Sequence, residues 1–210
     1  FWDNAYVVHS LYGGDSLASI IDECAAAGNP DRPIVFASTS KIVYAGGGVS
    51  AVASSAGNMK LIKSRVTAQT IGPDKINELR HARMFKTVSD LKAHMERHAE
   101  ILRPKFKAVI EVFEKELGGT GIAEWTNPRG GYFISVDTLG GCASETVAMC
   151  KEAGVVFTPA GATYPYGKDP SDRNIRIAPT SPSVDDLKKA MELFCVSLKL
   201  VSAKRIMENA

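Results

Sequence analysis

The residues with the clearest potential for chemistry lie in the segment Phe36-Ala37-Ser38-Thr39-Ser40-Lys41, which leads toward the glycine run Gly46-Gly47-Gly48. A lysine amine can form Schiff bases with carbonyl cofactors. The hydroxyls of Ser38 and Ser40 can donate hydrogen bonds to a phosphate, and glycines let a ligand approach the backbone closely. The alternative interpretation is a surface lysine on a polar loop, so the assignment depends on the residues around this segment.

Three further side chains could act together with Lys41. Asp3 and Tyr6 stand three residues apart at the start of a predicted strand, where they would present an acid and a phenol near one sheet edge. Arg176 lies between two isoleucines in a predicted strand, so alternation places it on the opposite face from these neighbours. A guanidinium is well suited to bind a carboxylate through two hydrogen bonds. Taken singly, Asp3 could equally be an ordinary polar strand end and Arg176 a surface residue.

The composition is that of an ordinary globular protein. The chain has 210 residues, of which 45% are hydrophobic and 23% charged, and its formal net charge is +2. This length suits one or two domains, and the near-neutral charge gives no reason to expect nucleic acid or a membrane as partner. No apolar run approaches the roughly 20 residues that span a bilayer. The chain starts at Phe1 directly in strand-like sequence, which suggests a fragment lacking its amino-terminal part.

Cysteine and histidine patterns give no support for a metal site. The four cysteines are far apart and lack CxxC spacing, so we expect neither a zinc site nor a disulfide framework, and a reducing cytoplasmic location is favoured. His94 and His98 stand four residues apart on a predicted helix and could in principle bind a metal. The sequence between them differs from the metalloprotease motif, and we expect a solvated helix face there.

Strand and helix patterns alternate along the whole chain. Strands are predicted at 2–9, 33–37, 49–54, 122–125, 132–136, 155–157 and 174–178, and helices at 17–27, 57–66, 73–85, 89–117, 144–153 and 183–207. The first strand, helix and strand form a unit typical of a parallel sheet, in which ligands bind at the carboxyl ends of strands. Lys41 lies just beyond such an end. Pro104 is expected to kink the long fourth helix rather than end it.

In order and approximate spacing, these motifs resemble the fold-type I pyridoxal-phosphate aminotransferases. The resemblance is carried by Asp3-x-x-Tyr6, Ser38-x-Ser40-Lys41, Pro128-Arg-Gly-Gly-Tyr-Phe133 and Asn174-Ile175-Arg176. Longer strings at residues 3–9, 69–75, 124–128 and 158–168 resemble one bacterial branch, the aspartate aminotransferases described as MocR-like. The resemblance covers essentially the whole chain. It implies an α/β fold with part of the large mixed-sheet domain in residues 1–86, followed by a linking helix and a small C-terminal α/β domain in residues 87–210.

The resemblance also implies a role for each candidate residue on the cofactor, pyridoxal 5′-phosphate. Lys41 would bind the cofactor aldehyde and later move the proton of the substrate α-carbon. Asp3 would pair with the pyridine nitrogen, and Tyr6 would bond the 3-oxygen of the ring. Ser38 and Ser40 would bind the phosphate.

Further implications concern the substrate and the assembly. Arg176 would hold the α-carboxylate of the amino acid or 2-oxo acid substrate. The loop at residues 69–75 resembles the segment that reaches the active site of the partner subunit, so a homodimer with shared sites is expected. Many relatives carry a phosphate-binding arginine eight residues after the lysine, and this chain has Val49 there. Because the family's amino-terminal half supplies further cofactor contacts, the chain alone should not be a competent enzyme.

The function implied is amino transfer from aspartate to 2-oxoglutarate by a ping-pong mechanism in the cytoplasm, without metal, nucleic acid or membrane. One alternative is another reaction of the same fold, such as that of a lyase or decarboxylase. A second alternative is the ligand-sensing aminotransferase-like domain of a transcription regulator.

Overall fold

The computed structural model describes residues 1–14 and 16–208. The chain divides into two units, Phe1–Arg97 and His98–Ala210, and the boundary falls within the long helix α4 (Val88–Leu117). Each unit has its own three-stranded sheet. Within the described part of the chain, no helix is both long and apolar enough to cross a membrane.

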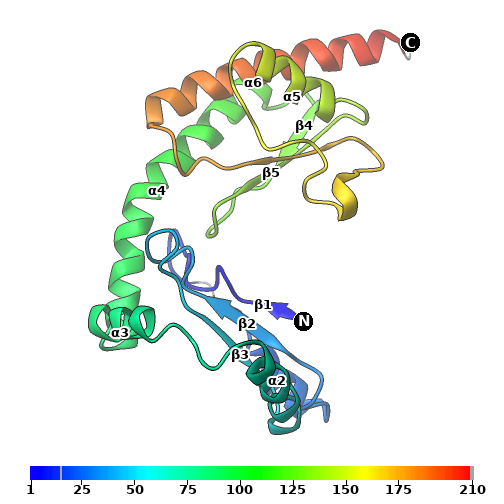
Figure 1. Cartoon of the computed structure of the whole chain (residues 1–210). Helices are drawn as coiled ribbons and strands as arrows, with labels where there is room; N and C mark the ends of the chain where they lie inside the picture. Colours follow the sequence, from blue (N-terminus) through cyan, green and yellow to red (C-terminus); the bar gives the residue numbers. More distant parts are fainter. Residues whose placement is uncertain (15, 209–210) are drawn as a thin grey trace. The chain divides into compact units, whose positions relative to one another are not determined.

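The first unit is built on a mixed sheet in the order β1 (Trp2–Asp3), β2 (Val35–Ser38) and β3 (Ser50–Ala53) (Figure 1). β1 runs parallel to β2, with Asp3 opposite Phe36, and β2 runs antiparallel to β3. The parallel pair confirms the strand–helix–strand unit expected from the sequence. It also places the ends of β1 and β2 at the same edge of the sheet, where Asp3 and Ser38 stand.

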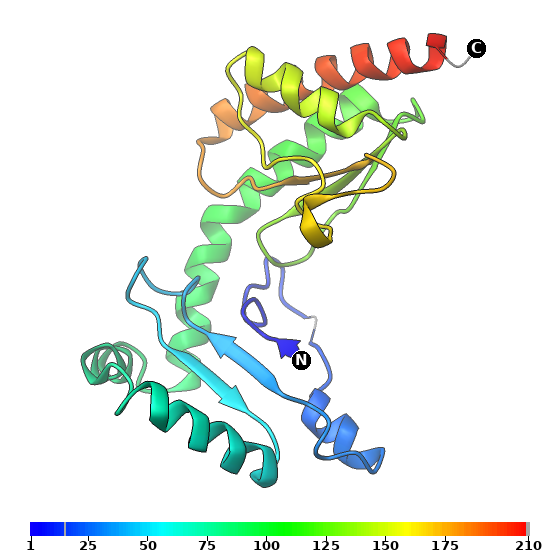
Figure 2. The ribbon, with the colours of Figure 1, turned by 45° about the vertical axis from the view of Figure 1, so that its right-hand side comes forward.

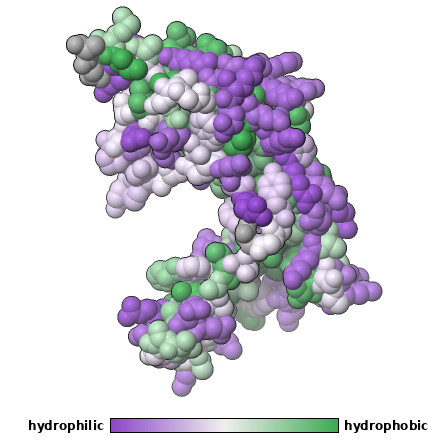
Figure 3. Space-filling model, turned by 180° about the vertical axis from the view of Figure 1, so that it is seen from behind, coloured by the Kyte–Doolittle hydropathy of each residue, from purple (hydrophilic) through white to green (hydrophobic). Residues whose placement is uncertain are grey.

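Three short helices accompany this sheet: α1 (Ile20–Ala26), α2 (Ala56–Gln69) and α3 (Lys75–Met84). Figure 2 shows α1 and α2 lying beside the strands β2 and β3. None of the three helices has a buried residue, and Figure 3, in which the molecule is seen from behind, shows hydrophobic patches (green) mixed with hydrophilic residues near α1. Leu61 of α2, for example, is 60% exposed. The apolar faces of the first unit are therefore largely uncovered within this chain.

The second unit has a better packed core. Its antiparallel sheet runs in the order β4 (Ala123–Trp125), β5 (Ile134–Thr138) and β6 (Asn174–Ile177). Helices α5 (Ala143–Glu152) and α6 (Val184–Glu208) lie side by side (Figures 1 and 2). The alternating residues Ile134, Val136, Ile175 and Ile177 are all at most 1% exposed. This face of the sheet forms the core together with the buried rings of Phe113 and Phe194, whose centroids lie 5.7 Å apart.

The structure differs from the predicted elements at several places. Helix α1 begins at Ile20 rather than at residue 17, because Ser19 is its N-cap. The first strand ends at Asp3 because residues 5–8 form turns, in which His9 N–H donates to the Tyr6 carbonyl at 3.0 Å. Residues 155–157 pair with no strand; Phe157 instead packs its ring edge-on against Phe194, with the centroids 5.4 Å apart. Helix α3 begins at Lys75 rather than at residue 73, since Asp74 is its N-cap. The continuation of α4 through Pro104 is confirmed.

Candidate active site

The candidate nucleophile Lys41 lies in a turn at residues 39–42, which we call the lysine turn, directly after β2. The β2–β3 ladder ends with the pair Ser38 and Ser50. Beyond it, Thr39 N–H donates to the Val49 carbonyl at 2.9 Å, and Val49 N–H donates to Thr39 Oγ1 at 2.9 Å. The end of the sheet thus holds the start of the turn firmly, while the Lys41 side chain remains exposed.

Glycines after the turn allow a close approach of the backbone to Ser40. A Cβ atom on Gly48 would lie 3.0 Å from Ser40 Cα and 3.1 Å from its nitrogen and hydroxyl oxygen, closer than side chains normally pack. A Cβ on Gly47 would meet the ring of Tyr44 at 2.5 Å. A side chain at position 48 would therefore crowd the backbone beside Lys41, whereas one at position 47 would mainly displace the exposed ring of Tyr44.

The hydroxyls of Ser38 and Ser40 have no hydrogen-bond partner among the described residues. Ser38 is half-buried and Ser40 is exposed, so both are accessible to an external oxygen acceptor. Val49 occupies the position eight residues after Lys41, where the resemblance implies an arginine in many relatives. Its backbone serves the lysine turn through both bonds to Thr39.

Asp3 and Ser38 line the same cavity, which has a volume of about 580 Å³. Asp3 ends β1, and its Oδ1 accepts a 2.9 Å hydrogen bond from the N–H of Ala5. Tyr6 follows three residues after Asp3 in the turn, not in a strand, and its ring packs edge-on against His9 with the centroids 5.3 Å apart. The edge formed by the parallel strands β1 and β2 therefore brings together a carboxylate and a hydroxyl, with a phenol and the lysine amine in the turns that follow.

Three histidines that were not assigned to the site contact the lysine turn. His9, His81 and His94 each place Nε2 within 3.2 Å of an oxygen atom in the turn. Nothing in the sequence marks them, because they are separated by 72 and 13 residues and belong to different elements. The half-buried His94 also corrects the expectation of a solvated helix face at that position.

In the second unit, Arg176 stands on the face of β6 opposite its buried isoleucine neighbours, as predicted from alternation. Its guanidinium carbon lies 4.5 Å from the centroid of the Phe133 ring, a stacking geometry that favours a cation. Its Nε atom is buried and has no hydrogen-bond partner among the described residues. An unsatisfied buried donor of this kind is suited to an oxyanion.

A polar network fixes the strand that carries Arg176. Asn174 Nδ2 donates to Ser135 Oγ at 2.8 Å and to Asp137 Oδ1 at 2.9 Å, while its Oδ1 accepts from Thr163 Oγ1 at 2.6 Å. The Asp169 carboxylate accepts three backbone N–H bonds, from residues 171, 173 and 174, and these bonds lower its pKa below the ordinary value. The network joins β5, β6 and the preceding loop, so the position of Arg176 along its strand is well defined.

Metal-binding and redox groups are not apparent in the described residues. They contain no group of three or more histidine, cysteine or acidic residues that could hold a metal ion. The four cysteines are free, and burial raises the pKa of Cys195 to about 12.

The fold and these groups define a class of protein. A pyridoxal-phosphate aminotransferase of fold-type I has these features: a mixed sheet in an α/β fold, a lysine beyond the end of a strand, and accessible serines beside that lysine. Residues 1–210 match the family described as aspartate amino-transferase, and the chain belongs to that family. The family implies pyridoxal phosphate as cofactor.

Two curated relatives illustrate the similarity. An aspartate aminotransferase of Corynebacterium glutamicum is 44% identical over 206 residues, which cover 97% of this chain and 47% of the relative. A candidate aminotransferase of Mycolicibacterium smegmatis is 50% identical over 194 residues, which cover 91% of this chain and 45% of the relative. The chain thus spans about half the length of the curated relatives it matches.

Solved structures agree with this assignment. The crystal structure of an aspartate transaminase from Corynebacterium glutamicum matches with a TM-score of 0.94 and 43% identity, covering 97% of this chain and 48% of that chain. An α-aminoadipate aminotransferase of Thermus thermophilus, complexed with N-(5′-phosphopyridoxyl)-L-leucine, matches with a TM-score of 0.77 at 19% identity, covering 96% of this chain and 50% of that chain. The second likeness shows the fold alone. The predicted fold class, α/β of fold-type I with part of the large domain and a small C-terminal domain, is confirmed.

The residues present fit the cofactor that the family implies. Pyridoxal phosphate needs an amine for its aldehyde, donors for its phosphate and an anion for its ring nitrogen. Lys41, the two unpartnered serine hydroxyls and Asp3 have these properties, and the glycine at position 48 leaves room beside Ser40.

Proposed function

We propose that this chain forms part of a longer protein that transfers the amino group of aspartate to 2-oxoglutarate with pyridoxal 5′-phosphate. The observation that carries the proposal is the location of Lys41, exposed just beyond the end of β2 with the accessible hydroxyls of Ser38 and Ser40 beside it. The Corynebacterium relatives named for aspartate support this substrate. Since those relatives are about twice as long, activity is expected of the full-length protein.

Five residues of the first unit would hold the cofactor. Lys41 Nζ would bind its aldehyde carbon, and the serine hydroxyls would donate to its phosphate. The Asp3 carboxylate would hold the proton on the pyridine nitrogen, and the Tyr6 hydroxyl would donate to the ring 3-oxygen. When bound, the cofactor supplies an electron-withdrawing ring that accepts the electrons of the broken α-C–H bond.

The substrate would be oriented by Arg176 and deprotonated by Lys41. The Arg176 guanidinium, stacked on Phe133 with a buried unsatisfied Nε, would bind the substrate α-carboxylate and fix which α-bond faces the cofactor plane. Lys41 Nζ would take the α-proton as general base and return a proton as general acid. Because aspartate and 2-oxoglutarate would use the same groups in turn, ping-pong kinetics are expected.

The finer assignments follow from resemblance and chemistry. We place the protein in the MocR-like branch of aspartate aminotransferases on the strings at 3–9, 69–75 and 158–168. A homodimer is supported by the exposed linker at residues 70–74 between α2 and α3, in which Ile71 is fully exposed. A cytoplasmic location is supported by the four free thiols, since oxidising compartments favour disulfides.

The test is an absorbance spectrum of the full-length protein with pyridoxal phosphate, before and after addition of aspartate. Lys41→Ala is compared with Lys41→Arg, which keeps the positive charge but cannot bind the aldehyde. We expect a visible band that needs Lys41, is absent in both variants and bleaches with aspartate, with oxaloacetate and glutamate formed once 2-oxoglutarate is added.

Other outcomes contradict the proposal in different ways. A lysine-dependent band that aspartate leaves unchanged would rule out the substrate. Pyruvate and ammonia, or a decarboxylated amine, would replace transamination by a lyase or decarboxylase reaction. A spectrum identical in wild type and Lys41→Ala would remove Lys41 from the site.

A further inference from the structure

Two histidines donate hydrogen bonds to backbone oxygens of the lysine turn. His9 Nε2 lies 3.2 Å from the Lys41 carbonyl oxygen, and His94 Nε2 lies 2.9 Å from the Ile42 carbonyl oxygen. A carbonyl oxygen can only accept, so Nε2 carries the proton in both rings. The Nδ1 atom of His94 lies 3.4 Å from the guanidinium of Arg97, which can only donate. The ring of His94 therefore donates to the turn from Nε2.

A third histidine contacts a side chain of the same turn. His81 Nδ1 lies 2.7 Å from the Asn77 carbonyl oxygen, so this nitrogen carries a hydrogen. Its Nε2 lies 2.7 Å from Thr39 Oγ1, which also accepts the N–H of Val49 and lies 3.4 Å from the Val49 carbonyl oxygen. The ring of His81 thus connects helix α3 to the first residue of the turn.

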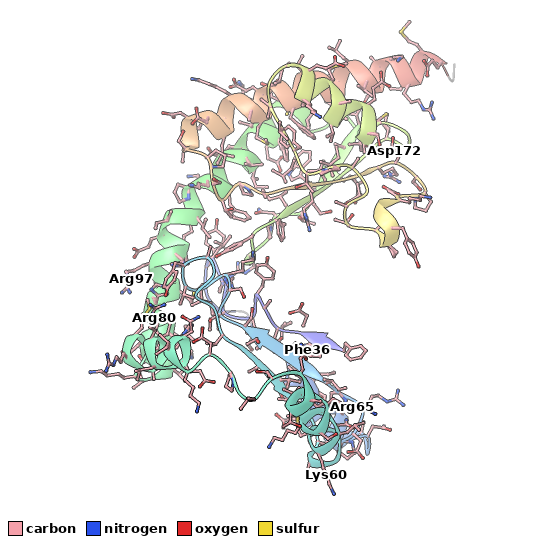
Figure 4. All side chains as sticks on the ribbon, in the orientation of Figure 1. Phe36, Lys60, Arg65, Arg80, Arg97 and Asp172 are labelled. Carbon is pink, nitrogen blue, oxygen red and sulfur yellow. The ribbon has the colours of Figure 1, made fainter. Side chains whose placement is uncertain are left out.

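The supporting side chains also contact one another. The Phe85 ring lies between two of the histidines, with its centroid 6.4 Å from that of His81 and 5.3 Å from that of His94. Next to His81 in α3, Arg80 donates to the hydroxyl of Tyr44 at 2.8 Å, on the far side of the turn. Figure 4 shows Arg80 on α3 and Arg97 on α4, the two charged residues that accompany these contacts. Helices α3 and α4 thus act as one support for the lysine turn.

We propose that His9, His81 and His94 are positioning residues that hold the lysine turn and so fix the direction in which the Lys41 side chain leaves it. Each of the three rings takes a different attachment point within four residues, and a turn held at three points has little freedom to rotate. The role in catalysis rests on the proposed function of Lys41. The restraint of the turn is a property of this chain with or without cofactor.

One of the three rings makes the turn sensitive to pH. Burial lowers the pKa of His9 below its ordinary value of 6.5. Because the open turn then binds a proton more tightly than the closed turn, the closed turn is most stable above about pH 6.5 and loses stability as the pH falls below that value.

The test is hydrogen exchange of the peptide covering residues 39–49 in the full-length protein without cofactor, expressed as protection factors at pH 7.5 and pH 5.5. His94→Leu removes the donor to the Ile42 carbonyl, and His94→Gln restores a donor near the same place. We expect protection to fall about fivefold in His94→Leu, the effect of one lost hydrogen bond of ordinary strength, and to return in His94→Gln. The melting temperature reports whether the variants remain folded.

The pH dependence separates positioning from simple packing. In the wild type, protection of this peptide should fall between pH 7.5 and pH 5.5, whereas His9→Gln should show a smaller fall. Equal protection in wild type and in folded His94→Leu, or the same pH response in His9→Gln, would overturn the proposal. If protection of the turn changes as expected while no Lys41-dependent absorbance band forms, the proposed function fails and the positioning role stands. If the band forms while protection of the turn does not change in the histidine variants, the positioning role fails and the proposed function stands.

Discussion

At the scale of single residues, the surroundings of Arg176 make it sensitive to a change that keeps its charge. Lysine at this position would retain a cation but lose the planar group that stacks on Phe133 and offers two parallel donors. Loss of one charge-assisted hydrogen bond costs about 1.5–3 kcal/mol, so we expect Arg176→Lys to raise KM for aspartate by roughly 10- to 150-fold. Steady-state kinetics of the full-length protein measure this effect.

The neighbouring Arg173 provides a matched control. Its Nε donates to the Thr138 carbonyl at 2.9 Å, within the sheet, and it has no place in the proposed site. Arg173→Lys should leave KM for aspartate within about twofold of wild type, a difference below half a kcal/mol. If both variants changed KM equally, Arg176 would not be the carboxylate ligand.

At the scale of elements, helix α3 depends on its N-cap. The Asp74 carboxylate accepts the N–H groups of Ile76 and Asn77 at 3.0 and 3.1 Å, and also the Asn77 side-chain amide at 2.9 Å. Replacing such a cap by alanine costs about 1 kcal/mol, so exchange of the first-turn amides in Asp74→Ala should be roughly fivefold faster. Since α3 carries His81, protection of the lysine turn should fall in parallel.

The variant Asp74→Asn keeps an acceptor oxygen at the same position and serves as control. It should retain most of the protection because asparagine caps helices about as well as aspartate. Loss of protection in Asp74→Asn as large as in Asp74→Ala would show that charge, not the capping hydrogen bond, stabilises α3.

At the scale of the whole molecule, the exposed linker at residues 70–74 bears on the expected oligomeric state of the protein. Ile71 is fully exposed in the loop that resembles the segment reaching the partner subunit, so burial of its side chain there would stabilise a dimer. We expect the full-length protein to sediment as a dimer and Ile71→Asp to shift it toward monomer at micromolar concentration. The control is Val156→Asp, because Val156 also lies outside any helix or strand and is 77% exposed.

Sedimentation velocity gives a direct answer. A wild-type protein that sediments as monomer would contradict the homodimer. A dimer that Ile71→Asp and Val156→Asp leave equally intact would contradict the place of the linker in the interface.

Local sequence determined much of this protein. The alternation of Asn174-Ile175-Arg176-Ile177 decided which side of β6 carries the arginine, and the apolar strand before Ser38 placed Lys41 beyond a strand end. Side-chain direction in a strand follows from its period of two, and a strand–helix–strand unit gives a parallel pair. The side-chain direction follows from neighbours within a few residues, and the parallel pair follows from the order of elements along the chain, so both features could be predicted.

Only the tertiary structure decided the contacts between distant segments. Cys142, the N-cap of α5, makes no capping bond; the cap comes from Asp172 (Figure 4), whose carboxylate accepts the Ser144 N–H at 3.0 Å and hydroxyl at 2.6 Å. The contacts of His9, His81 and His94 with the lysine turn likewise join segments that are distant in the sequence. Partners 28 to 52 residues apart leave no periodic signal, because their meeting depends on how whole elements pack rather than on local backbone preferences. The sequence by itself placed the lysine, and the packed fold determined what surrounds it.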